Sequence, residues 1–222
     1  MVVPMEENKR IWPGDVAAGE IEILEEVLVW SNPVARLFND RVRFPNGEGG
    51  EPEEGEQFRL GEAEDLDDGV VVVPITHDNR ILLIRQFRHP IRMWMRELPR
   101  GARNRGESPA STAARELREE IGYDAEATYS LGRIANDSGQ LTGLPFLVAA
   151  RVRDAGEREP QSTEAIDQIL PYSFSELKRA CQRGDIIDSF TLCAVVRLEP
   201  HFIGDRFAYS AEDAPPPATN EA

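Results

Sequence analysis

The stretch Gly101–Tyr123, GARNRGESPASTAARELREEIGY, holds four glutamates and a helix-start signal within 23 residues. Ser108 followed by Pro109 is the N-cap and first-turn pairing of a helix, and Gly122 is placed to end it. The spacing therefore predicts a helix over residues 109–121. At about 100° per residue, one narrow apolar stripe of this helix is expected to face the core. Its members are Ala110, Ala114, Leu117 and Ile121.

Glutamates crowd one side of this predicted helix. Glu116, Glu119 and Glu120 have the i, i+3, i+4 spacing and share an adjacent arc of the helix surface. Like charges at this spacing destabilise a helix by a few tenths of a kcal/mol per pair, roughly, and a bound cation would reverse the sign. Arg115 stands one turn before Glu119 and next to Glu116, so that it is able to orient a carboxylate, as is Arg118.

The residues before the helix extend the acidic pattern. Glu107 lies at the helix N-terminus, where the helix dipole favours negative charge. The preceding loop, bounded by Gly101 and Gly106, is expected to bend and bring backbone carbonyls toward the same face. Carboxylates with a backbone oxygen are hard ligands that suit Mg²⁺ or Mn²⁺. For Glu116 and Glu119 alone, an exposed amphipathic helix remains the commoner interpretation.

The overall charge limits the partners of this chain. The 222 residues suit one domain, or a main domain with a small appendage. Lys and Arg total 25 against 40 Asp and Glu, a formal net charge of -15. Such an excess repels nucleic acid and anionic lipid, so we expect neither as a partner. An anionic substrate would need a local group of arginines or a bound cation.

Targeting and redox signals favour the cytoplasm. The first ten residues lack a basic start followed by an apolar region, and the longest apolar run, Gly69–Ile75, is far below the ~20 residues of a membrane span. Cys181 and Cys193 are the only cysteines, twelve residues apart and without metal-type neighbours. We therefore expect a soluble protein of a reducing cytoplasm.

Hydrophobic periodicity divides the chain into three regions. We expect a β-rich N-terminal region at residues 1–66, a main domain at 67–200 and a flexible acidic, Pro-rich tail at 201–222. Ser173 and Glu176 form a capping box that opens a helix closed by Gly184. A further helix is expected at residues 188–198, an exposed hairpin tip at 46–56, and strands at 21–30, 34–44, 69–75, 80–88, 129–134 and 144–152.

The complete spacing of the glutamate-rich stretch resembles the signature of the Nudix hydrolases. It reads Gly, five residues, Glu, seven residues, Arg-Glu-aliphatic-any-Glu-Glu-any-Gly. Tyr123 departs from the aliphatic residue usual there. The flanking stretches WSNPVARLFNDRVRFPNG, QFRHP and RELPRGA are similar to the ADP-ribose pyrophosphatase branch, and the similarity covers roughly residues 20–200. The resemblance implies an α/β fold, the Nudix α/β/α sandwich with a mixed sheet, plus a small β-rich N-terminal region whose strands build a homodimer.

The resemblance also implies roles for residues of the helix. Nudix enzymes hydrolyse a diphosphate that links a nucleoside to another group, and they use divalent metal, here Mg²⁺ with Mn²⁺ possible. By position in the signature, Glu116 and Glu120 are the principal metal ligands, and Glu119 is a further ligand or orients water. Arg115 supports these carboxylates, with Gly101 and Glu107 in supporting positions. The backbone carbonyl of Arg100 is the remaining implied metal ligand.

Outside the helix, the resemblance implies three more site residues. Arg88 would contact substrate phosphates, Glu97 matches a position near substrate and metal, and Glu164 matches a loop glutamate proposed as general base. Judged by residue type alone, each of the three would be a surface side chain. Three aromatic residues of the N-terminal strands either stack on the nucleotide base or pack in the core: Trp30, Phe38 and Phe44.

The segment after residue 135 leaves the substrate open. ADP-ribose hydrolases typically have Pro where this chain has Ser138, and an acid where it has Gly143, although Gly139 keeps the turn. ADP-ribose, hydrolysed to AMP and ribose 5-phosphate, remains the first expectation. Another nucleoside diphosphate sugar is the alternative, and a non-catalytic nucleotide-binding module is a second. Nucleoside triphosphates and dinucleotide polyphosphates are less favoured because their smaller hydrolases generally lack the N-terminal extension.

Overall fold

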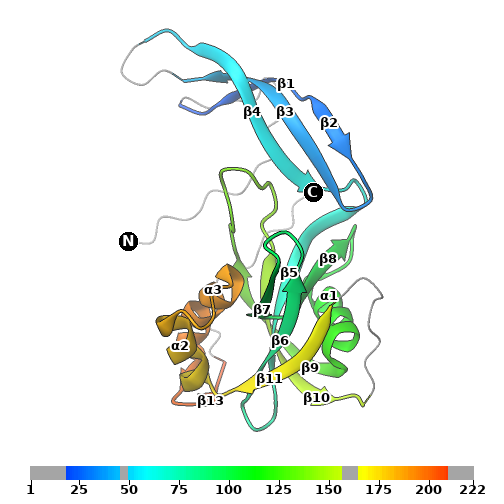
Figure 1. Cartoon of the computed structure of the whole chain (residues 1–222), viewed down its shortest axis with the longest axis vertical. Coiled ribbons are helices and arrows are strands. Elements are labelled where there is room, and N and C mark those ends of the chain that lie inside the picture. The colour runs from blue at the N-terminus through cyan, green and yellow to red at the C-terminus, as the bar shows by residue number, and fades with distance from the viewer. Residues whose placement is uncertain (1–18, 46–49, 157–164, 210–222) are drawn as a thin grey trace. The chain divides into compact units, whose positions relative to one another are not determined.

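The computed structural model describes residues 19–45, 50–156 and 165–209. They form two compact units. The first contains residues 19–65 together with Asp137–Thr142, and the second contains Leu66–Asn136 and residues 143–209. Figure 1 labels most of their strands and the α-helices.

The first unit is an antiparallel sheet around a central strand. Strand β3 (Ala35–Phe44) pairs with β1 (Glu22–Glu25), β2 (Leu28–Ser31) and β4 (Glu53–Glu62). The single strand expected at 21–30 is therefore two strands. They are separated because the backbone N–H of Val27 donates to the Oδ1 of Asp40 at 3.1 Å, instead of to a strand carbonyl.

The pairing of β3 with β4 is longer than the sequence predicts. The exposed hairpin tip expected at 46–56 is wrong at its C-terminal end, because β4 begins at Glu53, opposite Phe44. Strand pairing in register with β3 outweighs the low strand propensity of the Glu-rich segment. Arg43 of β3 forms an ion pair with Glu54 of β4 across this pairing. Residues 46–49 lie outside the described residues.

The segment Asp137–Thr142 pairs with β4. Leu60 donates its backbone N–H to the carbonyl of Gln140 at 2.8 Å and accepts from the N–H of Thr142 at 3.0 Å. A Cβ on Gly61 would lie 2.8 Å from the Oγ1 of Thr142, so a larger residue at this position would force the Thr142 side chain to move. The segment that departs from the ADP-ribose pattern is thus attached to the sheet of the first unit.

The second unit is built on a mixed sheet. Strand β5 (Leu66–Ile75) is parallel to β10 (Phe146–Asp154), and the remaining pairings are antiparallel. The order is β11-β6-β5-β10-β9, with β7 added to β6 and β8 added to β5. The other strands are β6 (Ile81–Arg88), β7 (Met93–Glu97), β8 (Arg100–Asn104), β9 (Tyr123–Arg133) and β11 (Ile166–Tyr172).

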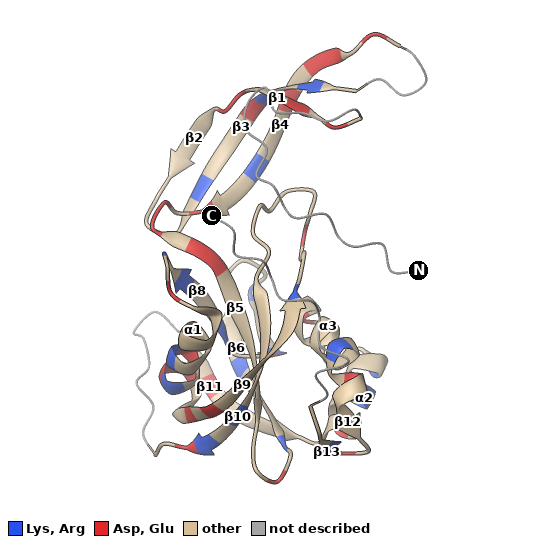
Figure 2. Ribbon diagram, turned by 180° about the vertical axis from the view of Figure 1, so that it is seen from behind, with Lys and Arg blue, Asp and Glu red and all other residues tan. Residues whose placement is uncertain are grey.

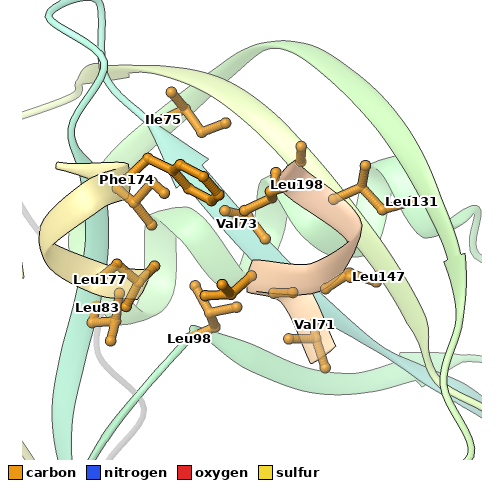
Figure 3. Packing of buried hydrophobic residues seen from close by; sticks show 14 of the residues in the cluster. Val71, Val73, Ile75, Leu83, Leu98, Leu131, Leu147, Phe174, Leu177 and Leu198 are labelled. Carbon is orange, nitrogen blue, oxygen red and sulfur yellow. The ribbon is translucent and has the colours of Figure 1, made fainter. Parts of the chain in front are cut away.

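Helices cover both faces of this sheet. Alternation along β5 sends Val71 and Val73 to a cluster with α2 (Phe174–Arg183) and α3 (Ser189–Leu198), shown in Figure 3. Val70 and Val72 point to the opposite cluster, which includes residues of α1 (Pro109–Glu116). Figure 1 shows α1 on one side of the sheet and α2 and α3 on the other. The predicted α/β/α sandwich is confirmed.

The predicted capping signals of α2 are confirmed, as is the helix expected at residues 188–198. Ser173 and Glu176 form the predicted reciprocal capping box, and Gly184 ends α2 in the left-handed conformation at φ 77°. Asp188 caps α3 by accepting from the N–H of Thr191. No helix in the described part of the chain is both long and apolar enough to cross a lipid bilayer.

The start of the predicted tail is folded. Residues 199–201 form a 3₁₀ turn, followed by the short strands β12 (Phe202–Ile203) and β13 (Arg206–Phe207). Phe202 stacks on Phe174 with ring centroids 4.4 Å apart, and both Phe202 and Phe207 are buried. The prediction of a flexible tail from residue 201 is therefore wrong for residues 201–207, where aromatic burial holds the chain. Residues 210–222 lie outside the described residues.

Candidate active site

The glutamate-rich helix begins and ends where the sequence predicts. The Oγ of Ser108 accepts from the N–H of Ser111 at 3.1 Å, and Gly122 ends the helix at φ 75°. The regular helix stops at Glu116, however, and Leu117–Ile121 forms a π-helical turn. The wider turn carries two of the predicted metal-site glutamates, and such turns are frequent at functional sites.

The buried side of this helix differs from the predicted stripe. Ala110 is exposed and Ala114 is half-buried, whereas Ala113, Leu117 and Ile121 pack against the sheet at i, i+4 spacing. This rotation of the helix also turns glutamates inward. The side chains of Glu116 and Glu120 are only 3% and 1% exposed. Carboxylates are rarely buried to this extent unless they are paired or bind a cation.

Gly101 leaves space for the carboxylate of Glu116. A Cβ built on Gly101 would lie 1.9 Å from Oε1 and 2.1 Å from Cδ of Glu116, distances that no real contact reaches. The expected bend of a loop at Gly101 is wrong. Residues 100–104 form strand β8, and the turn follows at Gly106 with φ 78°. Gly101 is required by close approach.

Arg115 joins three carboxylates. Its Nη1 donates to Oε1 of Glu116 at 2.7 Å and to Oε2 of Glu119 at 3.0 Å, and its Nε lies 3.5 Å from Oε1 of Glu107. Its Nη2 donates to the carbonyl of Ala102 on β8 at 2.8 Å. Burial by itself lowers the pKa of Arg115, but the charges of the three glutamates outweigh burial and raise it. Three carboxylates around one guanidinium group leave an excess of negative charge. Figure 2 shows that acidic and basic residues both occur on α1.

Glu107 is held by the turn that precedes the helix. Its Oε2 accepts from the backbone N–H of Asn104 at 3.2 Å and from the Asn104 side-chain amide at 3.3 Å. Burial raises the pKa of Glu107, but the Asn104 hydrogen bond and the positive charge of Arg115 together lower it below its usual value. Glu107 thus contacts Arg115 and the turn, and its supporting role at the site stays a prediction.

Strand residues complete the predicted group. The backbone N–H of Arg100 donates to Oε2 of Glu120 at 3.2 Å, and the Arg100 Nη2 lies 3.3 Å from Oε2 of Glu97. The other oxygen of Glu97 pairs with Nη2 of Arg88. Glu97 is fully buried between these two guanidinium groups. Of the predicted site residues, only Glu164 cannot be placed, because it lies outside the described residues.

Two residues of this network were not foreseen. Asp188 accepts from Nη1 of Arg100 at 2.9 Å through Oδ1, and its Oδ2 accepts from the N–H and Oγ1 of Thr191 at 2.9 Å and 2.7 Å. The ring of Phe190 lies 4.7 Å from the Arg100 guanidinium carbon. The cap pattern of Asp188 and Thr191 predicts a helix start. Nothing in the sequence places it beside a residue 88 positions earlier.

The donor set fits a divalent cation by chemical type. Two buried carboxylates, Glu116 and Glu120, lie on one helix beside a region of excess negative charge, and carboxylate oxygens are the ligands that Mg²⁺ and Mn²⁺ prefer. Within the described ranges, no three Asp, Glu, His or Cys side chains already surround a metal position. Arg115 instead pairs with Glu116 and Glu119.

The three aromatic candidates of the first unit differ in how far their rings are exposed to solvent. Phe38 is buried, with the guanidinium carbon of Arg59 lying 3.9 Å from its ring centroid, and Phe44 is half-buried. Trp30 is 51% exposed. Phe38 is therefore a core residue, and Trp30 has the accessible ring.

Comparison with known proteins agrees with this fold. A NUDIX domain model matches residues 65–189, more than half of the chain. The chain therefore belongs to the Nudix family. Within that family it is a pyrophosphohydrolase similar to ADP-ribose pyrophosphatases.

Curated relatives match most of the chain. An ADP-ribose pyrophosphatase of Mycobacterium tuberculosis is 28% identical over 197 residues, covering 87% of this chain and 89% of that protein. A methanol dehydrogenase activator of Bacillus methanolicus is 28% identical over 176 residues, covering 77% and 88%. The solved structure of an ADP compounds hydrolase superposes with a TM-score of 0.67 at 18% identity, covering 83% of this chain and 95% of that one, and so supports the fold.

Proposed function

We propose that this chain catalyses the divalent-metal-dependent hydrolysis of the diphosphate linkage of a nucleoside diphosphate derivative. ADP-ribose, giving AMP and ribose 5-phosphate, is the substrate of first choice. The observation that carries the proposal is the burial of Glu116 and Glu120 on one helix, beside the surplus of negative charge around Arg115. The names of the Mycobacterium relative and of the solved structure support the substrate class.

The proposed metal would be Mg²⁺ or Mn²⁺. Glu116 and Glu120 would hold it, with Glu119 and the backbone carbonyl of Arg100 as further ligands. When bound, such an ion neutralises charge on the diphosphate and lowers the pKa of the attacking water. Arg115 would keep Glu116 and Glu119 oriented, because it contacts both.

The remaining steps fall to the side chains of this chain. Water adds to one phosphorus while its bond to the bridging oxygen breaks, and both products leave as phosphate monoesters. One proton of the water must be accepted, and Glu119 or Glu164 would accept it. Arg88 would bind a substrate phosphate. The Nε of Arg88 is buried without an acceptor among the described residues, so it has a donor to offer an anion.

The N-terminal strands would form a homodimer. Large apolar side chains are exposed on the described part of the first unit, and burial between two copies would remove them from water. They are Ile21, Leu28, Val29, Trp30, Val34, Phe58 and Leu141. We assign the protein to the cytoplasm, with a small-molecule nucleotide as its substrate. We assign no nucleic-acid or membrane partner, on the basis of its net charge of -15.

A second substrate class is favoured by the segment that pairs with β4. Ser138 and Gly143 replace the Pro and the acid typical of ADP-ribose hydrolases, and this segment forms a turn at residues 138–140 whose end pairs with Leu60. Another nucleoside diphosphate sugar is therefore the alternative substrate.

Product analysis tests the proposal. Purified protein would be incubated with ADP-ribose, GDP-mannose, UDP-glucose, NADH and diadenosine polyphosphates, each with Mg²⁺, Mn²⁺ or chelator. Metal-dependent AMP from ADP-ribose, well above the other products, is the expected result. Preference for another sugar would support the alternative class. Nucleotide binding without turnover of any substrate would contradict the proposed reaction and favour a binding module.

A further inference from the structure

Arg100 connects the glutamate-rich helix to the start of α3. Its backbone N–H donates to Oε2 of Glu120 at 3.2 Å, and its guanidinium group lies between Glu97 at 3.3 Å and Asp188 at 2.9 Å. The residue therefore contacts a predicted metal ligand through its backbone and two buried acids through its side chain. A change in the position of Arg100 would reach Glu120 directly.

Asp188 forms an ion pair with the guanidinium group of Arg100. Asp188 is only 6% exposed, and its two carboxylate oxygens accept hydrogen bonds from different residues. Oδ1 accepts from Arg100, while Oδ2 accepts from the N–H and hydroxyl of Thr191 and so caps α3. Because Oδ2 is fixed by the helix start, Oδ1 has one orientation toward the guanidinium. The cap thus makes Asp188 a rigid support.

The same helix start also holds the strand backbone. The Oγ1 of Thr191 accepts from the N–H of Leu98 at 3.2 Å, between Glu97 and Arg100 in the chain. Residues 97–100 are therefore fixed to α3 at two points, one through Leu98 and one through the Arg100 side chain. This double attachment is the arrangement expected for residues that orient a site.

We infer that Asp188 is a positioning residue that acts on metal binding through Arg100. The inference rests on the proposed function, because it concerns the same site. Charges alternate along Arg88, Glu97, Arg100 and Asp188. Removing the charge of Asp188 leaves the guanidinium group of Arg100 paired with Glu97 alone and lowers the negative charge of the site. A cation then binds less well, and Arg100 is released to move relative to Glu97.

The variant Asp188→Asn separates this role from the helix cap. Asparagine is as good an N-cap as aspartate, so α3 keeps its start while the charge toward Arg100 is lost. The probe is Mn²⁺, titrated into the substrate-free protein and followed by electron paramagnetic resonance. We expect the Kd for Mn²⁺ to rise about tenfold, as for other groups that orient metal ligands, and kcat/KM at limiting metal to fall by a similar factor.

A double-mutant cycle shows whether Asp188 acts through Arg100. In the background Arg100→Met, which keeps the backbone N–H to Glu120, adding Asp188→Asn should change the Kd for Mn²⁺ less than about twofold. The matched control is Asp185→Asn, which removes the same charge from an exposed ion pair with Arg183. It should leave the Kd unchanged. Ser173→Ala, which removes a helix cap on α2, should lower Tm without changing the Kd for Mn²⁺.

Two results would overturn the inference. One is an unchanged Kd for Mn²⁺ in Asp188→Asn. The other is an equal loss of affinity in the wild-type and Arg100→Met backgrounds, which would mean that Asp188 does not act through Arg100. A wild-type protein that binds Mn²⁺, shows the coupling and yet hydrolyses none of the substrates would contradict the proposed function and leave the inference supported. A wild-type protein that binds no Mn²⁺ would contradict both.

Discussion

A single added methyl group at Gly101 should disable the site. In Gly101→Ala the new Cβ would lie 1.9 Å from Oε1 of Glu116. The carboxylate must withdraw by about 1.5 Å, the difference between this distance and the shortest ordinary contact of 3.4 Å. Glu116 is buried and paired with Arg115, so it has little room to adjust without giving up that ion pair.

The size of the effect follows from this displacement. Misplacement of an active-site group by 1 Å costs about a hundredfold in rate, so we expect kcat of Gly101→Ala to fall by about that factor or more. The cost in stability should be about 1–3 kcal/mol, as for other overpacked buried sites, because Glu116 must give up its ion pair with Arg115 to make room. Steady-state hydrolysis and thermal melting, followed by circular dichroism, measure the two quantities.

Controls make this test specific. Gly139→Ala adds the same methyl group where the nearest atom is 3.5 Å away, and it should leave rate and Tm unchanged. If Gly101→Ala acts by displacing Glu116, then Glu116→Gln should cost little more in the Gly101→Ala background. A folded Gly101→Ala variant with a rate within threefold of the wild type would refute the assignment of Glu116 to the chemistry.

The remaining predictions concern charge, pH and capping. Glu116→Gln and Glu120→Gln should each lower kcat, because each variant loses transition-state stabilisation on the order of several kcal/mol. Tm should fall little, because like charge is removed. Wild-type rates in both variants would exclude these residues as metal ligands. The lowered pKa of Glu107 stabilises the fold above the usual carboxyl pKa, and this contribution is lost as pH falls through the folded value. Glu107→Gln should therefore reduce the loss of Tm between neutral pH and pH 3, and an unchanged difference would contradict the contacts with Arg115. Ser173→Ala should lower the free energy of unfolding by about 1 kcal/mol in urea titrations. No change would mean that the capping box does not contribute to stability.

Local chemistry explains which elements were predictable. The cap of Ser108 and the stop at Gly122 bound the helix because each depends on residues within one turn. The ion pairs of Arg115 with Glu116 and Glu119 were predictable for the same reason, since the helix spacing places these side chains together. The signature spacing carried the family assignment, and a model of the NUDIX domain matches the same region.

Elements that depend on distant partners were missed. Strand β8 reads RGARN and has no apolar alternation, and it exists because its backbone pairs with β5. Residues 201–207 read as the beginning of a tail, but Phe202 and Phe207 pack against Phe174 and other core residues. The π-helical turn likewise has no signature in the residues that form it.

The amino-acid sequence by itself therefore determined the helix of carboxylates, its caps and the family, because these depend on spacing along a few turns. Only the tertiary structure decided which glutamates are buried and why Gly101 must lack a side chain, since both follow from how β8 packs against α1. It also decided that Arg100 meets Asp188, a residue 88 positions away. Contacts at that separation are set by the order of strands in the sheet and the packing of helices against it, and no local sequence pattern predicts them.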